Sequence, residues 1–151
     1  MIVQMHEVVL DISGGKSGFH RETNVHRAAE RPLTYISYVE SFDVDTVCAI
    51  LIDAIAVYHG FNDGNKRTAL MTAIFTYRIN GVHFRATIAM NKEFDALVIW
   101  VVRKKPTIPE IEARLKKLRD KFEAAKPQSI TTMFVSFIKM RTRKETAKNN
   151  Q

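Results

Sequence analysis

The chain has 151 residues, which is enough for one domain and a short appendage. Hydrophobic residues make up 46% and charged residues 26%, and these proportions exclude a disordered or collagen-like chain. The apolar run Ala96–Val102 is too short to span a membrane, and the N-terminus lacks the early basic residues of a secretory signal. A single cysteine, Cys48, cannot form an internal disulfide, so we expect a cytoplasmic protein with Cys48 in its core.

The net charge of +7 is unevenly distributed. Residues 1–99 carry a net charge of −2, whereas residues 100–151 carry +9. A basic C-terminal third is compatible with binding to nucleic acid, to a ribosomal surface or to an acidic protein. The alternative, a solvated helix face with a solubilising tail, is favoured because no zinc-ligand spacing and no DNA-reading motif is present.

The first third of the chain contains two predicted helices and one predicted extended segment. A helix over Met1–Ile12 should end at Ser13-Gly14-Gly15, because glycine adopts the left-handed conformation that closes helices. A short polar helix over Arg21–Ala29 should stop before Pro32, since proline disfavours the α conformation of the preceding residue. Leu33–Phe42 is rich in β-forming residues and is predicted to be extended or to form a small hairpin.

Two strongly apolar helices are predicted in the middle of the chain. The first begins at an Asp43 or Asp45 cap and runs to about His59, and it is apolar on nearly all sides, which indicates a central, buried helix. The second runs from about Asn65 to Ile79 and should end at Asn80-Gly81.

Further helices are predicted from about Asn91 to Val102 and, after a Thr107 opening, to about Phe122. Pro127 should break the chain, and the apolar spacing from Ile130 to Ile138 predicts an additional amphipathic helix with a basic end. We therefore predict an all-α fold with one domain over residues 1–126 and a basic C-terminal helix and tail over residues 127–151.

Two glycine-containing segments are candidate phosphate sites. Gly14-Gly15-Lys16-Ser17 resembles the end of a P-loop, but Leu10 occupies the position of the required first glycine and no buried strand precedes it, so a turn is the better interpretation. The stretch from His59 to Thr68, between the two most apolar helices, is more informative. It combines a base, a carboxylate, a flexible glycine and two cations directly before a helix N-terminus, where free N–H groups favour phosphate.

The spacing His59-x-Phe61-x-Asp63-Gly64-Asn65-Lys66-Arg67 resembles the signature of the Fic/Doc family. Gly14-Gly15 through Arg31-Pro32, Thr68-Ala69-Leu70 and Asn80-Gly81 resemble its death-on-curing (Doc) branch, and the similarity covers about residues 4–122. This resemblance implies a compact Fic-type helical bundle that transfers part of ATP, with Mg²⁺, to a hydroxyl of a target protein.

The resemblance also implies a role for each residue of the signature. His59 would be the catalytic base, Asp63 would hold Mg²⁺, and Phe61 would anchor the loop in the core. The nucleotide would be bound by Gly64, Asn65, Lys66 and Arg67. The extended flap that docks the target would include Leu33, Thr34, Tyr35, Ile36 and Ser37.

Lys66 decides which group we expect to be transferred. Most family members with Gly at this position resemble AMP transferases, whereas Lys accompanies an inverted ATP and phosphate transfer in the Doc branch. Gly64 departs from that branch, in which Ala is typical, so AMP transfer stays open as the alternative. The Doc resemblance suggests elongation factor Tu as the target and a block of translation as the outcome.

No glutamate in the sequence follows a Ser or Thr by four residues, the spacing of the family's self-inhibiting motif. The resemblance therefore implies a toxin-like protein with a separate antitoxin, and an Arg67 side chain that is free to bind phosphate. A non-catalytic basic module that binds nucleic acid remains the second alternative.

Overall fold

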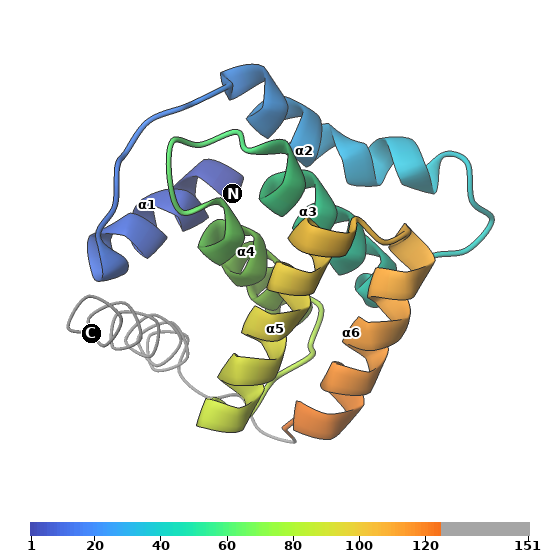
Figure 1. Cartoon of the computed structure of the whole chain (residues 1–151). Coiled ribbons are helices and arrows are strands. Elements are labelled where there is room, and N and C mark those ends of the chain that lie inside the picture. The colour runs from blue at the N-terminus through green and yellow to red at the C-terminus, as the bar shows by residue number, and fades with distance from the viewer. Residues whose placement is uncertain (125–151) are drawn as a thin grey trace.

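A computed structural model describes residues 1–124, and these residues form six helices joined by short connections (Figure 1). The helices are α1 (Ile2–Ser13), α2 (Glu22–Ile36), α3 (Val44–Tyr58), α4 (Asn65–Ile79), α5 (Ile88–Lys104) and α6 (Ile108–Phe122). Within residues 1–124 there is no strand, only two isolated bridges. The predicted all-α class is confirmed, while the predicted C-terminal helix and tail, residues 127–151, lie outside the described residues.

Helix α3 is the centre of the bundle. It packs against α2, α4, α5 and α6, while α1 packs mainly against α4. Eleven of the fifteen residues of α3 are buried, Cys48 among them, as its nearly uniform apolar composition predicted. Helices α3 and α4 together supply about half of the buried apolar core, and the loop between them is therefore anchored at both ends in that core.

Side-chain capping interactions mark the starts of α3, α5 and α6. The Asp43 carboxylate accepts a hydrogen bond of 3.0 Å from the Thr46 N–H at the start of α3. At the start of α6, the N–H of Thr107 donates to the Glu110 carboxylate over 2.8 Å. Helix α5 begins three residues earlier than the predicted start at Asn91, because the hydroxyl of Thr87 accepts from the Met90 N–H over 3.1 Å and caps the helix there.

The observed extent of α2 shows that two predictions were wrong, the end of this helix at Ala29 and the extended segment from Leu33. The helix does not stop at Ala29 but continues through Pro32 to Ile36, and proline inside a helix normally costs about 3 kcal/mol. Pro32 is buried together with other apolar residues of α2, which packs against α3. Arg31 donates to the buried Asp53 of α3 over 2.5 Å. These tertiary contacts outweigh the local preference to end the helix.

The predicted extended flap is consequently wrong for most of its residues. Leu33, Thr34, Tyr35 and Ile36 form the last turn of α2, and Ser37 follows with helical backbone angles. Only residues 39–42, after the turn, lack helical structure. The β-forming side chains of this segment did not decide its conformation because the helix is fixed by its buried face.

Three cations of α6 form ion pairs with acidic residues of α6 and of other segments. Lys116 lies 3.1 Å from Asp43 and 2.7 Å from Glu112. Lys121 lies 2.7 Å from Glu93, and Arg119 pairs with the buried Asp45. No helix within residues 1–124 is long and apolar enough to cross a membrane.

Candidate active site

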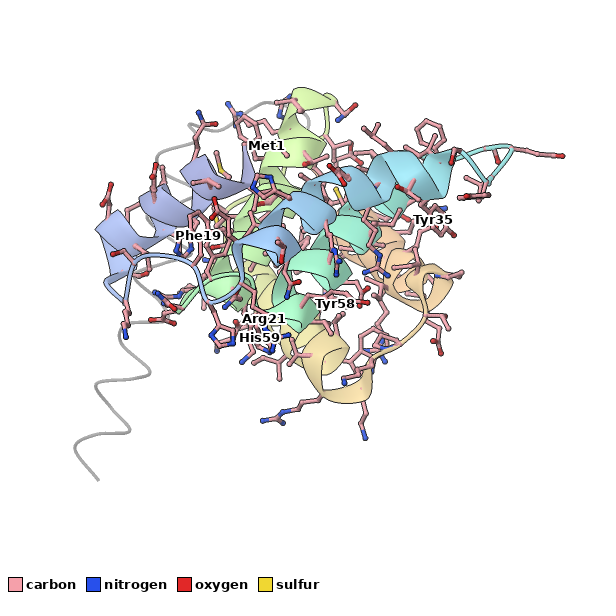
Figure 2. The ribbon with its side chains drawn as sticks, turned by 90° about the horizontal axis from the view of Figure 1, so that it is seen from above. Met1, Phe19, Arg21, Tyr35, Tyr58 and His59 are labelled. Carbon is pink, nitrogen blue, oxygen red and sulfur yellow. The ribbon has the colours of Figure 1, made fainter. Side chains whose placement is uncertain are left out.

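The loop between α3 and α4 borders an open pocket of about 300 Å³. Helix α3 ends where His59 adopts a left-handed conformation with φ of 47°, which turns the chain sharply out of the helix. His59 itself is exposed at the pocket edge (Figure 2). The pocket is lined by His59, Asn62, Asp63, Gly64, Asn65, Lys66 and Arg67, so His59 borders the same space as Asp63, Lys66 and Arg67.

The N-terminus of α4 forms the floor of this pocket. Gly64 precedes the helix with φ of 75°, a left-handed conformation that favours glycine. The first helical hydrogen bond of α4 runs from the Thr68 N–H to the Gly64 carbonyl over 2.8 Å. The N–H groups of Asn65, Lys66 and Arg67 therefore have no acceptor inside the helix, and together with the helix dipole they suit an anion.

Asp63 and Arg67 form an ion pair beside this helix end. The Asp63 carboxylate lies 3.3 Å from the Arg67 guanidinium and accepts a 2.5 Å hydrogen bond from the Gly64 N–H. Burial alone would raise the pKa of Asp63, but these contacts and the Lys16 N–H outweigh it and hold that pKa below its ordinary value. Asp63 is therefore an anionic, partly exposed oxygen donor at the pocket.

Arg67 has hydrogen-bond partners that the sequence did not reveal. Its guanidinium donates to the hydroxyl of Ser13 and, over 3.0 Å, to the carbonyl of Gly14. Only 16% of its side chain is exposed. Arg67 thus joins the end of α1 to the signature loop, and a phosphate would bind to an arginine whose direction is already fixed.

Asn65 holds the loop closed rather than reaching into the pocket with its amide group. Its side-chain oxygen accepts from the Phe61 N–H over 3.0 Å, and its side-chain nitrogen donates to the Phe61 carbonyl over 2.9 Å. Asn65 is buried, as is Phe61, which is 2% exposed. An anion at the start of α4 would therefore meet the backbone N–H of Asn65 and not its side-chain amide.

The connection between α1 and α2 covers the signature loop, a feature that sequence reasoning missed. The N–H groups of His20 and Arg21 donate to the Gly60 carbonyl, and the Asn62 N–H donates to the Gly18 carbonyl over 3.0 Å. Phe19 lies against Phe61 with ring centroids 5.6 Å apart, and Figure 2 shows Phe19 and Arg21 in this connection. This pairing along residues 60–62 braces the loop from outside.

Within this connection, Gly15 lies next to the Asp63–Arg67 pair. A Cβ atom on Gly15 would lie 2.5 Å from the Asp63 carboxylate and 3.3 Å from the Arg67 guanidinium. The Gly14-Gly15-Lys16 segment has irregular structure, without the predicted turn, and packs on the Asp63–Arg67 pair. The signal was present in the sequence as two consecutive glycines, although nothing local showed what they approach.

A buried histidine, His6 of α1, was also missed. It is 3% exposed and stacks on Phe61, with ring centroids 3.8 Å apart and planes 12° apart. Its Nδ1 lies 3.1 Å from the Thr68 hydroxyl, across the start of α4. A single histidine in a helix gives no sequence signal for such a position, because its partners are 55 and 62 residues away.

None of the five residues predicted to dock the target lines the pocket at His59. Thr34 lines a second pocket of about 300 Å³ between α2 and α3, together with Arg27, Arg31 and Tyr58. Tyr58 directly precedes His59, so this pocket adjoins the C-terminal end of α3 (Figure 2). Leu33 is 72% exposed on the last turn of α2.

Asp63 is suited to a magnesium ion whose other ligands come from a nucleotide. Residues 1–124 contain no group of three His, Cys, Asp or Glu side chains that could hold a metal by themselves. Mg²⁺ typically uses one or two carboxylates plus phosphate oxygens and water. An ionised carboxylate beside a helix N-terminus is consistent with that arrangement and not with a metal caged by protein alone.

Comparison with known proteins agrees with this geometry. The chain is 33% identical over 81 residues to a protein named "Protein kinase doc" from Escherichia phage P1. The match covers 54% of this chain and 64% of the phage protein, so it spans just under two thirds of that relative. The family model described as the Fic/DOC family matches residues 1–77, which include α1, the covering connection and the whole signature loop. The chain therefore belongs to the Fic/DOC family.

Proposed function

We propose that this protein transfers a phosphate from ATP to a hydroxyl group of a target protein. The observation that carries the proposal is the pocket in which His59, Asp63, Lys66 and Arg67 surround the open N-terminus of α4. This arrangement pairs a base with a helix end and cations that suit phosphate. The kinase name of the phage relative supports the same reaction.

The chemistry requires placement and charge neutralisation rather than a covalent enzyme intermediate. The target hydroxyl oxygen forms a bond to the γ-phosphorus, and the bond from that phosphorus to the β–γ bridging oxygen breaks. His59 accepts the hydroxyl proton, and ADP leaves. The N–H groups of the first turn of α4, with Arg67, hold the charged phosphate oxygens in place.

Asp63 would hold magnesium, which supplies charge neutralisation on the phosphates when bound. Because Asp63 also pairs with Arg67, the carboxylate and the guanidinium keep a fixed separation at the pocket. We infer that this pair places the metal ligand and the phosphate ligand next to each other before ATP binds.

Lys66 supports phosphate transfer over AMP transfer. Its side chain lines the pocket and is partly buried there, so a mobile positive charge occupies space near the anion site. AMP transfer is the alternative within the same family, and the glycine at position 64 is the feature that favours it. The two reactions differ in which phosphorus becomes bonded to the target.

A non-catalytic role in nucleic-acid binding is less well supported. Three of the five cations of α6 are already paired with a carboxylate, namely Lys116, Arg119 and Lys121. Paired surface cations bind phosphate backbones more weakly than free ones, because the existing pair must be broken. The basic residues after position 124 lie outside the described part of the chain.

A labelling experiment tests the proposal. The protein is incubated with a bacterial lysate and Mg-ATP labelled at the α or the γ phosphorus. Transfer of γ-label to a protein is expected, and His59→Ala should reduce it by at least about 100-fold, the usual scale for a positioned base. His26→Ala removes another exposed histidine, on α2, and should retain full transfer.

The outcome also decides between the alternatives. Transfer of α-label by the unmodified protein would establish AMP transfer instead of phosphate transfer. Salt-dependent retention of DNA or RNA that is unaffected by His59→Ala, without any label transfer, would favour the nucleic-acid module.

We further propose that the target is a component of translation such as elongation factor Tu, and that a separate antitoxin restrains the enzyme. Expression in a susceptible bacterium should arrest growth in a manner that depends on His59. Harmless expression, with arrest only after truncation at Pro127, would indicate instead that residues 127–151 inhibit the enzyme.

A further inference from the structure

His6 contacts both ends of residues 61–68, the segment that contains the proposed anion site. On one side its ring stacks on Phe61, which enters the loop, at a centroid distance of 3.8 Å. On the other side its Nδ1 meets the hydroxyl of Thr68, in the first turn of α4, at 3.1 Å. Between these two contacts, a Cβ on Gly64 would lie 3.4 Å from the His6 ring.

The environment of His6 is suited to the neutral ring. Burial and the nearby Arg67 lower its pKa from 6.5, and the weaker effects of Asp63 and Glu7 oppose that shift. Its Nε2 is buried without a hydrogen-bond partner among the described residues. The buried, unpaired Nε2 lowers the stability of the folded protein. We expect the contacts of the His6 ring with Phe61 and Thr68 to offset that cost.

We propose that His6 is a positioning residue for the anion site, which sets the relation between Phe61 and the first turn of α4. The inference rests on the proposed function of that site. Helix α1 packs on α4, and its last residue, Ser13, accepts a hydrogen bond from Arg67. Because α1 is fixed in this way, the His6 side chain that it carries holds Phe61 and Thr68 in place. Loss of the Thr68 contact would let the first turn of α4 shift and misdirect the N–H groups that hold the transferred phosphate.

Two near-isosteric substitutions test the contact from both sides. His6→Phe keeps a ring against Phe61 and removes Nδ1, whereas Thr68→Val keeps the shape of residue 68 and removes the hydroxyl. Residue-resolved hydrogen exchange follows the Phe61 and Thr68 amides, which donate to Asn65 and Gly64. Each variant should accelerate exchange at these two amides by about tenfold, the scale of one lost hydrogen bond.

Kinetics then separate positioning from a merely structural role. Each variant should lower kcat/KM for ATP by about tenfold, and the double variant should lose little more, because both substitutions remove one shared contact. His83→Phe is the matched control, since His83 also has a buried ring nitrogen without a partner among residues 1–124 but lies between α4 and α5. It should change neither the Phe61 and Thr68 exchange nor kcat/KM.

Two results would overturn the inference. The first is unchanged exchange at Phe61 and Thr68 in both folded single variants. The second is accelerated exchange with full kcat/KM, which would leave His6 a structural role only. If the parent protein transfers no phosphate, the proposed function fails, while the exchange rates still decide whether His6 holds the loop.

Discussion

Gly15→Ala should damage the site from outside the signature. Gly15 has φ of 130°, and an added Cβ would meet the Asp63 carboxylate at 2.5 Å and the Leu10 side chain at 2.9 Å. The backbone conformation alone costs about 1–3 kcal/mol for a residue with a Cβ. The close contacts add about 1–3 kcal/mol, the usual cost of overpacking.

The neighbouring glycine provides the matched control. Gly14 also has a positive φ, 71°, but an added Cβ would meet nothing within 4 Å. Gly14→Ala therefore carries the backbone cost without the contact with Asp63. The free energy of unfolding should differ between the two variants by about 1–3 kcal/mol, with Gly15→Ala the less stable.

Urea unfolding measures that difference, and ATP titration measures its effect on the site. Gly15→Ala should bind Mg-ATP more weakly than Gly14→Ala, because displacement of the Asp63 carboxylate disturbs its pair with Arg67. Equal stability and equal ATP affinity of the two variants would refute the reasoning that the covering segment positions this pair.

Lys66→Gly should reduce transfer of γ-label and allow transfer of α-label, because it removes the side chain that we expect to orient ATP. An unchanged label ratio in the transfer assay would show that Lys66 does not set the orientation of ATP. Asp63→Ala should raise the Mg²⁺ concentration needed for half-maximal transfer, since one of the few ligands of the ion is lost. Undiminished transfer at limiting Mg²⁺ would mean that Asp63 only supports the start of α4. Stability should also fall as the pH drops below 6.5, because the unfolded chain takes up the His6 proton before the folded chain does. The charged groups nearest to His6 are Arg67 on α4, Asp63 in the loop and Glu7 on α1. Thermal unfolding at several pH values should therefore show a weaker decline for His6→Phe than for the parent, and parallel curves would contradict the assignment.

Much of the fold could be predicted from the sequence because the relevant signals are local. The ends of α3, α4 and α6 depend on residues within one turn, such as Asp43 with Thr46 and Thr107 with Glu110. The nearly uniform apolar composition of α3 also identified the central helix. The polar residues of the pocket were predictable for the same reason, since they lie within nine consecutive positions from His59 to Arg67.

The tertiary structure decided what depends on contacts between distant parts of the chain. Helix α2 passes through Pro32 because its buried face and the Arg31–Asp53 pair stabilise it against α3, and no local rule contains that information. The partners of Arg67 at Ser13 and Gly14 are more than fifty positions away.

The contacts that orient the groups of the pocket also come from distant parts of the chain. The sequence determined which groups are available for the chemistry, because a helix N-terminus and its flanking residues form one continuous segment. The directions of those groups are set by α1 and by the connection that follows it, through His6 and Gly15. Hydrogen bonds and close packing act over a few ångströms in space irrespective of separation along the chain, so only the folded structure reveals them.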